Sequence, residues 1–118
     1  MIINVTKHSI RFQSAAGEVY EIAPSGVVID AWFQEEVVGN HSSGAQLVRA
    51  RIVPMMPTAE EQLAALEAEH PGELIVGSLI AAQAFPGRVV ALVAVEGFER
   101  VPSDQKRMRD DKFLTVSH

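Results

Sequence analysis

The sequence predicts one small α/β domain of the α+β kind, with a β-rich N-terminal half, a mixed sheet and two short helices. Three observations support this fold class. The chain has 118 residues, which suffices for a single hydrophobic core. Strand-like runs separated by turn signals fill its first half, and a capped helix with a strand–helix–strand pattern fills most of its second half. We therefore expect residues 1–118 to form one domain, with residues 103–118 as a candidate extended C-terminal tail.

The first strand is expected over residues 3–12. Because alternate residues of a strand share a face, Asn4, Thr6 and His8 then point to the same side as the two hydrophobic residues near the end of the strand. We call these three residues the polar trio. Burying such groups without hydrogen bonds costs about 1–3 kcal/mol each. The trio is therefore expected either to bond to neighbouring backbone or to line a pocket.

Three further strands are expected in the first half. Residues 19–22 partly alternate in polarity and are predicted to form a hairpin with the first strand. A Pro-Ser-Gly turn leads into a strand over residues 27–33, and a polar loop over residues 39–44 precedes a strand over residues 46–53. The apolar face of this last strand is expected in the core, which leaves Arg49 and Arg51 on a face toward solvent or a ligand.

Residues 58–61 have the spacing of a capping box and predict a helix over residues 59–69. Its buried face is expected to carry Ala59, Leu63 and Leu66. A strand over residues 73–76, a second helix over residues 79–85 with Ser78 as its N-cap, and a strand over residues 89–95 follow. These three form either a parallel βαβ unit or an antiparallel return. One last strand is expected over residues 113–116.

The composition limits the partners and the compartment. The formal charge of −5 argues against nonspecific nucleic-acid binding. A basic cluster over residues 106–109 is bracketed by aspartates and is interpreted as a solvated tail with internal ion pairs. The sequence shows no cysteine, secretory signal or apolar run that could cross a bilayer, so we expect a cytoplasmic protein without a membrane partner.

The sequence contains no recognisable catalytic or metal-binding motif. The four histidines lack zinc-ligand spacing, and a nucleophile elbow, a P-loop and a dinucleotide fingerprint are absent, so no cofactor is expected. A small anion has candidate partners in the polar trio, in Ser78 at a helix start, and in Arg51 and Arg88. Each has a structural alternative: His8 tied to backbone, Ser78 as a simple cap, Arg88 as a surface turn residue.

Three segments carry a recognisable pattern: residues 4–10 read Asn-Val-Thr-Lys-His-Ser-Ile, residues 22–27 contain Pro-Ser-Gly, and residues 75–82 contain Ser-Leu-Ile-Ala-Ala. In these segments the chain resembles a family of small, mostly uncharacterised proteins encoded by bacteriophages and prophages. The family pattern has Asn-Leu-Thr-Pro-His-x-Ile, a Pro-Ser-Gly turn and a Ser-Leu-x-x-Ala helix. Lys7 stands where the family usually has proline. The resemblance implies a phage context and action in the cytoplasm of a host cell, and it implies no mechanism.

These observations lead to three functional hypotheses. The first is a phage-encoded counter-defence protein that binds and sequesters a small anionic ligand, such as a nucleotide immune signal, as a homo-oligomer. The second is an inhibitor that occludes a host defence or regulatory protein, with the methionines at positions 55 and 56 as an apolar contact. The third is an enzyme in which His8 is a general base acting with Asp30 or Thr6. The missing catalytic motif favours a protein that is not an enzyme.

Overall fold

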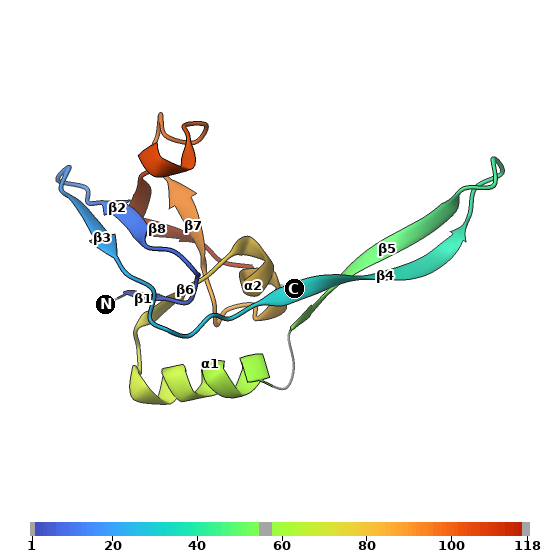
Figure 1. Cartoon of the computed structure of the whole chain (residues 1–118), viewed down its shortest axis with the longest axis horizontal. Helices are drawn as coiled ribbons and strands as arrows, with labels where there is room; N and C mark the ends of the chain where they lie inside the picture. The colour runs from blue at the N-terminus through green and yellow to red at the C-terminus, as the bar shows by residue number, and fades with distance from the viewer. Residues whose placement is uncertain (1, 55–57, 117–118) are drawn as a thin grey trace.

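The computed structural model describes residues 2–54 and 58–116. It shows a small α+β domain, strand-rich at 39%, with a mixed four-stranded sheet and two helices, so the predicted fold class is confirmed. The elements in chain order are β1 (Ile2–Asn4), β2 (Ile10–Gln13), β3 (Val19–Ile22), β4 (Ala31–Asn40), β5 (Gln46–Pro54), α1 (Thr58–Glu69), β6 (Leu74–Val76), α2 (Leu79–Ala84), β7 (Ala91–Ala94), a 3-10 turn (Ser103–Gln105) and β8 (Met108–Leu114). The other elements together form a compact part, which we call the body, and β4 and β5 project from it (Figure 1).

The four-stranded sheet has the order β3-β2-β8-β7. β2 pairs antiparallel with β3, as the predicted hairpin requires, and parallel with β8, while β7 is antiparallel to β8. β8 is therefore an interior strand, which corrects two expectations. Residues 108–114 are not an extended tail, and the last strand begins at Met108 rather than at Phe113. The charged run in its sequence, MRDDKFL, hides this strand from a hydrophobicity pattern.

The sheet carries the smaller of two buried clusters, centred on Phe12. The Phe12 ring is fully buried, stacks on Tyr20 with ring centroids 5.9 Å apart, and meets the edge of Phe113 at 6.4 Å. Aromatic pairs at these distances add attraction beyond the area they bury. Phe12 therefore ties three strands of the sheet together, since Tyr20 lies in β3 and Phe113 in β8.

β1 and β6 form a separate parallel pair. A parallel bridge between Val76 and Val90 links this pair to the chain entering β7. The unit formed by β6, α2 and β7 is thus the parallel one of the two alternatives, with the six-residue α2 as its crossover. Buried Gly77 makes this close approach possible, because a Cβ there would lie 2.9 Å from Cγ1 of Val89.

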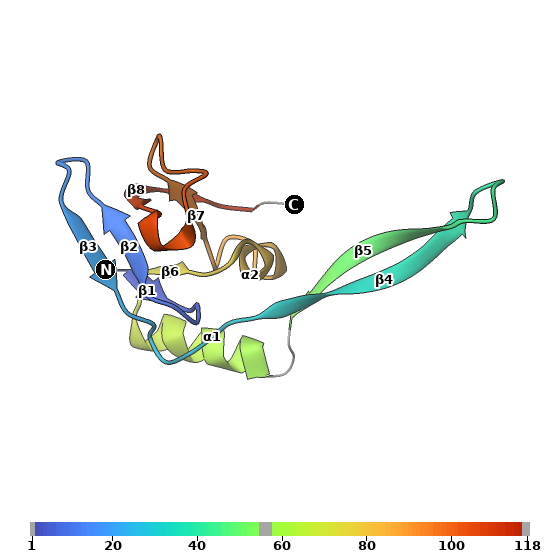
Figure 2. The ribbon, with the colours of Figure 1, turned by 45° about the horizontal axis from the view of Figure 1, so that its top comes forward.

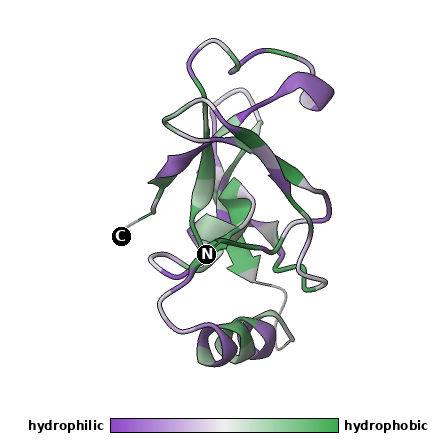
Figure 3. Ribbon diagram, turned by 90° about the vertical axis from the view of Figure 1, so that its left-hand side faces the viewer, coloured by the Kyte–Doolittle hydropathy of each residue, from purple (hydrophilic) through white to green (hydrophobic). Residues whose placement is uncertain are grey.

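The first helix, α1, covers the larger buried cluster. Its three buried residues are the predicted Ala59, Leu63 and Leu66. They pack in one cluster with Ile3 and Ile75 from the β1–β6 pair. Figure 3 shows the hydrophobic stretches of the strands meeting in the centre of the body, with α1 beneath them. The amphipathic spacing read from the sequence therefore corresponds to the observed core face.

β4 and β5 form a long two-stranded hairpin, the arm, which extends away from the body and accounts for much of the 56 Å length of the molecule (Figures 1 and 2). The register runs from Ala31↔Pro54 to Asn40↔Gln46, with an irregularity between Val37 and Gly39. The expectation that the apolar face of β5 lies in the core is wrong, because Val48 is 45% exposed. An alternating pattern of apolar and polar residues predicts which side chains share a face of the strand. Only the tertiary fold decides whether another part of the protein covers that face.

The single tyrosine of the chain gives a test of the β3–β8 contact. Partial burial of the phenol, together with its hydrogen bond to Asp110 (2.7 Å) and the charge of that carboxylate, raises the pKa of Tyr20 to about 12. Because this pKa is raised, the contact stabilises the fold fully below the ordinary phenol pKa near ~10 and is lost as the pH rises through 12. We expect an ultraviolet absorbance titration to show the high midpoint, and Asp110→Asn to lower it.

Asp111→Asn is the matched control for that titration. Asp111 is the next residue along β8, is exposed, and pairs with Arg109 at 2.8 Å instead of with the phenol. This variant should leave the tyrosine midpoint in place. Equal shifts in the two variants would show that the general negative charge of this strand acts on the phenol, and not the Asp110 contact.

Candidate functional site

The polar trio does not lie on one continuous strand. The chain bends over residues 6–8, so that β1 ends at Asn4 and β2 begins at Ile10. The prediction of a single strand over residues 3–12 is therefore wrong. The cause is local: Asn side chains can bond to backbone two residues further along and replace a strand by a turn.

Asn4 is the centre of this turn and is only 1% exposed. Its amide nitrogen donates to the carbonyl oxygens of His8 (2.8 Å) and Ile22 (3.1 Å). Its side-chain oxygen accepts from the backbone N–H of Thr6 (2.9 Å) and from the Thr6 hydroxyl (2.6 Å). Both donors and both acceptor positions of the amide are in use. Asn4 therefore joins the end of β1 to the bend over residues 6–8 and to β3, and the prediction that it contacts a ligand is not supported by this geometry.

Thr6 and His8 differ from Asn4 in exposure. The Thr6 hydroxyl lies 2.6 Å from the Asn4 side-chain oxygen and 2.9 Å from the His8 carbonyl oxygen, so its single proton serves the turn. The His8 imidazole is exposed, and no hydrogen bond to it occurs within residues 2–54 and 58–116. Within the trio, the His8 ring takes no part in the hydrogen bonds of the turn, and the Thr6 hydroxyl oxygen keeps acceptor capacity only.

His8 lines two neighbouring clefts. The larger one, the sheet cleft, has a volume of about 470 Å³. It is lined by His8, Ser9, Ile10, Arg11, Glu21, Leu92, Ser103, Asp104, Lys106 and Met108. The smaller one, the loop cleft, has a volume of about 260 Å³. It is lined by Val5, Thr6, Lys7, His8, Val28, Ile29, Asp30 and Ser78. The bend over residues 6–8 thus separates two concave surfaces that share one imidazole.

The sheet cleft has an apolar floor and a charged rim. Ile10, Leu92 and Met108 supply the apolar atoms. Among the rim residues, Arg11 donates to the carbonyl oxygen of Asp104 (2.9 Å) and pairs with Glu21 at 3.3 Å.

Lys106 differs from Arg11 because no carboxylate of the described residues lies within ion-pair distance of its ammonium. Pattern reasoning missed Lys106 because the 106–109 cluster was interpreted as a solvated tail. Part of that interpretation holds, since Arg109 does pair with Asp111.

The loop cleft gathers three of the predicted ligand residues: Thr6, His8 and Ser78. Ser78 is the predicted N-cap of α2, and its hydroxyl oxygen accepts from the backbone N–H of Ala81 at 3.1 Å. Asp30 also lines this cleft and accepts from its neighbouring backbone N–H at 2.9 Å. Much of the polar capacity here already serves local structure, so we regard the sheet cleft as the principal candidate site.

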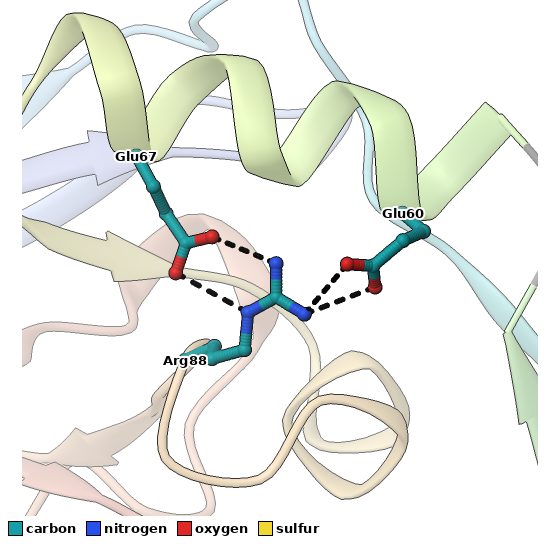
Figure 4. A network of polar contacts seen from close by, with 3 residues as sticks. All are labelled: Glu60, Glu67 and Arg88. Atoms are coloured by element: carbon teal, nitrogen blue, oxygen red, sulfur yellow. Dashed lines mark hydrogen bonds and ion pairs between the residues drawn. The ribbon is translucent and has the colours of Figure 1, made fainter.

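Arg88 has a structural role instead of the predicted ligand contact. Figure 4 shows its guanidinium between two carboxylates of α1. It donates to Glu67 through Nε (3.2 Å) and Nη2 (2.7 Å), and to Glu60 through Nη1 at 3.0 and 2.9 Å. The guanidinium also lies 5.6 Å from the centre of the Phe85 ring. Arg88 therefore fastens α1 to the segment that follows α2, and neither cleft includes it.

Arg51 does not join the site either. It lies in β5, opposite Gln34 in the register, and is exposed on the arm. Neither the sheet cleft nor the loop cleft includes it. The sequence left this face open to solvent or to a ligand, and the structure places Arg51 on the exposed arm, outside both clefts. Spacing along one strand carries no information about where that strand lies relative to the clefts.

The Arg88 contacts predict a pH-dependent loss of stability. The hydrogen bonds from Arg88 lower the pKa of the Glu67 carboxyl below its ordinary value. A lowered pKa means that this contact stabilises the fold fully above the ordinary glutamate value near ~4.3 and is lost as the pH falls through the native value. Arg88→Met should reduce the free energy of unfolding by about 1–2 kcal/mol at neutral pH, a value reduced for partial exposure. Denaturant titrations should show this deficit shrinking in acid.

Arg100→Met controls for the loss of one positive charge. Arg100 is exposed, and none of the described ion pairs involves it. We expect this variant to stay within about 0.5 kcal/mol of the parent at each pH. A deficit in Arg88→Met that persists unchanged in acid would assign the effect to lost packing on Phe85 instead of to the carboxylates.

Comparison with known proteins gives no match: no family model, curated protein or solved structure is similar to this chain. Within residues 2–54 and 58–116, no three histidine or carboxylate side chains group as they would around a metal ion. In the same residues no helix has both the length and the apolar character needed to span a membrane. The candidate function therefore depends on the clefts themselves.

Proposed function

We propose that this chain is a phage-encoded accessory protein that binds and sequesters a small anionic ligand, with a nucleotide signal of host immunity as the leading candidate, and that it does so as a homo-oligomer. The phage context comes from the resemblance in the N-terminal, Pro-Ser-Gly and Ser-Leu segments. The observation that carries the ligand proposal is the sheet cleft, whose lining combines three apolar side chains with Lys106, a lysine that forms no ion pair with any carboxylate of residues 2–54 and 58–116.

The chemistry of the sheet cleft suits a nucleotide. Its volume of about 470 Å³ falls in the range of small-molecule sites, which usually combine an apolar lining with a few polar groups. Lys106 can bind a phosphate as a point charge, and the exposed His8 ring can add a hydrogen bond. The floor of Ile10, Leu92 and Met108 offers contact to a base or ribose. Glu21 and Asp104 on the rim can accept from amino or hydroxyl groups.

Sequestration without turnover fits the same geometry. General-base catalysis by His8 would need a side chain that orients the imidazole. In the described residues no hydrogen bond joins the His8 imidazole to Asp30 or to Thr6, and the hydroxyl proton of Thr6 serves the turn. We therefore expect a bound nucleotide to be recovered intact after long incubation. Recovery of a converted product would favour the enzyme hypothesis.

The binding test is calorimetry with a panel of cyclic and linear nucleotides. Lys106→Met keeps most of the apolar stem and removes the charge, so it should weaken binding of the best nucleotide about 10- to 100-fold. Lys112→Met is the matched control, because Lys112 lies in β8, is exposed and lines neither cleft. It should change the affinity less than about threefold. No heat with any nucleotide, or equal losses in both variants, would contradict the proposal.

Occlusion of a host protein is a second candidate, favoured by the exposed arm. Val37 and Val38 are 57% and 52% exposed, so two neighbouring valines present apolar surface that a protein partner could cover. The methionines at positions 55 and 56, proposed as a contact from the sequence, lie outside the described residues. A pull-down from host lysate that yields one stoichiometric protein, together with silent nucleotide calorimetry, would favour this function over ligand capture.

A further inference from the structure

The bend over residues 6–8 holds one peptide group in a fixed orientation. The carbonyl oxygen of His8 accepts from the amide nitrogen of Asn4 at 2.8 Å and lies 2.9 Å from the Thr6 hydroxyl. Because Asn4 is only 1% exposed, this carbonyl is directed toward the interior. In a planar trans peptide group the N–H lies on the side opposite to the carbonyl oxygen. The N–H of Ser9, which belongs to the same peptide group, is therefore directed away from the interior.

This outward N–H is not used by the fold. It has no acceptor among residues 2–54 and 58–116, and Ser9 is exposed and lines the sheet cleft. A backbone N–H that is held in place before binding suits an anion, because the donor does not have to reorganise when the anion arrives. The hydrogen bonds of Asn4 and Thr6 thus orient a donor at the border of the sheet cleft, although neither side chain lines that cleft.

Other donors in the sheet cleft favour a phosphate monoester as the anion. In the described part of the chain the hydroxyls of Ser9 and Ser103 form no hydrogen bond, and the ammonium of Lys106 forms no ion pair. The exposed His8 ring lines the same cleft. A phosphate monoester has three terminal oxygens and nearly two negative charges at neutral pH. A phosphodiester has fewer free oxygens and one charge, so it would leave more of these donors unused.

One charged group in the sheet cleft opposes an anion. Arg11 and Glu21 pair with each other at 3.3 Å, which leaves Lys106 and the Asp104 carboxylate as the other charged groups of the lining. Among the described residues the Asp104 carboxylate forms no ion pair. An anion beside Lys106 is attracted by the ammonium and repelled by this carboxylate. Asp104 therefore limits the affinity of the cleft for anions.

We infer that the sheet cleft binds a terminal phosphate group, in the form of a phosphate monoester, and that the Ser9 N–H donates to this group beside Lys106. Asn4 and Thr6 are positioning residues for that N–H and do not touch the phosphate. The inference rests on the proposed function and narrows its ligand. A linear nucleotide with a terminal phosphate should bind more tightly than a cyclic nucleotide whose phosphate is a diester.

Methyl phosphate and dimethyl phosphate are the probes, because they differ by one methyl group and one negative charge. Nuclear magnetic resonance of the isotope-labelled full chain at about pH 7.5, above the second phosphate pKa of about 6, follows the Ser9 amide directly. Methyl phosphate should shift the Ser9 amide signal until it saturates, and dimethyl phosphate should bind at least about 10-fold more weakly. Thr6→Val should weaken methyl phosphate binding about 3- to 10-fold, and Thr6→Ser should restore it. Thr115→Val, an exposed position outside the cleft, is the matched control.

A gain of affinity provides a second test. Asp104→Asn should tighten methyl phosphate binding about 3- to 10-fold, because it removes the opposing charge and keeps the backbone carbonyl that accepts from Arg11 at 2.9 Å. Damage to the fold does not produce such a gain. Asp111→Asn makes the same change in net charge at an exposed position outside the sheet cleft, and it should change the affinity less than about twofold.

The outcomes separate this inference from ligand capture in general. Saturable binding of methyl phosphate with an unmoved Ser9 amide signal, or equal affinities for the two phosphates, would overturn the inference. Equal gains in Asp104→Asn and Asp111→Asn would also overturn it, since net charge alone would then explain the binding. In each of these cases ligand capture stands if nucleotide binding still depends on Lys106. If neither nucleotide heat nor a phosphate-dependent shift is observed, both proposals are wrong.

Discussion

Asn4→Asp is expected to destabilise the protein by about 3 kcal/mol or more at neutral pH. The substitution hardly changes the size of the side chain, but it replaces a nitrogen that donates to two carbonyl oxygens with an oxygen that cannot donate. The carbonyls of His8 and Ile22 then face a negative oxygen at about 3 Å in a site that is 1% exposed. Leaving each buried acceptor unpaired costs about 1–3 kcal/mol, and the buried charge adds to this.

The pH dependence of this variant identifies the cause. Burial and the two facing carbonyls should raise the pKa of the new carboxyl, because both disfavour its charged form. A raised pKa means that the neutral acid, which restores one donor, predominates in acid and is lost as the pH rises. The deficit relative to the parent should therefore be smallest in acid and grow toward neutral pH. Denaturant titrations of both proteins over this range measure it.

The chain offers a matched control in its other asparagine. Asn40 ends β4 at the exposed tip of the arm. Asn40→Asp makes the same chemical change without burial and should alter the free energy of unfolding by less than about 0.5 kcal/mol. A similar small effect in both variants would mean that Asn4 is not the junction of β1, the bend over residues 6–8 and β3. The polar trio would then again be a candidate binding site for a ligand.

The example of Asn4 shows why part of the site could not be predicted. Alternation correctly placed Asn4 in the interior, but it could not show that the chain turns over residues 6–8, because that turn is made by the asparagine itself. Arg88 presents the same difficulty. Its carboxylate partners Glu60 and Glu67 lie more than twenty residues earlier, so only the packing of α1 reveals them.

Sequence patterns predicted the structure correctly where the stabilising contacts lie within a few residues of one another. The helix face of Ala59, Leu63 and Leu66 and the Ser78 cap depend on contacts within a few residues, and both were predicted correctly. The prediction of β8 was wrong because the contacts that form this strand are distant in the sequence. Its place between β2 and β7 depends on backbone pairing with distant strands, which allows the charged run over residues 109–112 inside a sheet. Lys106, next to this strand, was missed as a cleft residue for the same reason.

Phe12→Ala is expected to have the other largest effect, a loss of about 3–5 kcal/mol in the free energy of unfolding. Phe12 is fully buried and contacts aromatic rings on both neighbouring strands, β3 and β8. Truncation removes a large side chain that is buried away from water and leaves a cavity in its place. The sheet cannot easily close this cavity, because backbone pairing holds its strands in position. Such a loss is a large part of the 5–15 kcal/mol that stabilises a typical domain.

Two measurements distinguish this loss from a general effect of removing a phenylalanine. Phe98→Ala removes a half-buried ring outside the strands, whose described aromatic contact is the Arg107 guanidinium at 4.9 Å, and should cost about 1 kcal/mol. The Tyr20 titration gives the second reading. Without the Phe12 ring, water reaches the phenol more freely, and its pKa should fall from about 12 toward the ordinary value. An unchanged Tyr20 midpoint in a destabilised Phe12→Ala variant would mean that β3 keeps its position without the stacked ring, and that the Asp110 contact alone holds the phenol on β8.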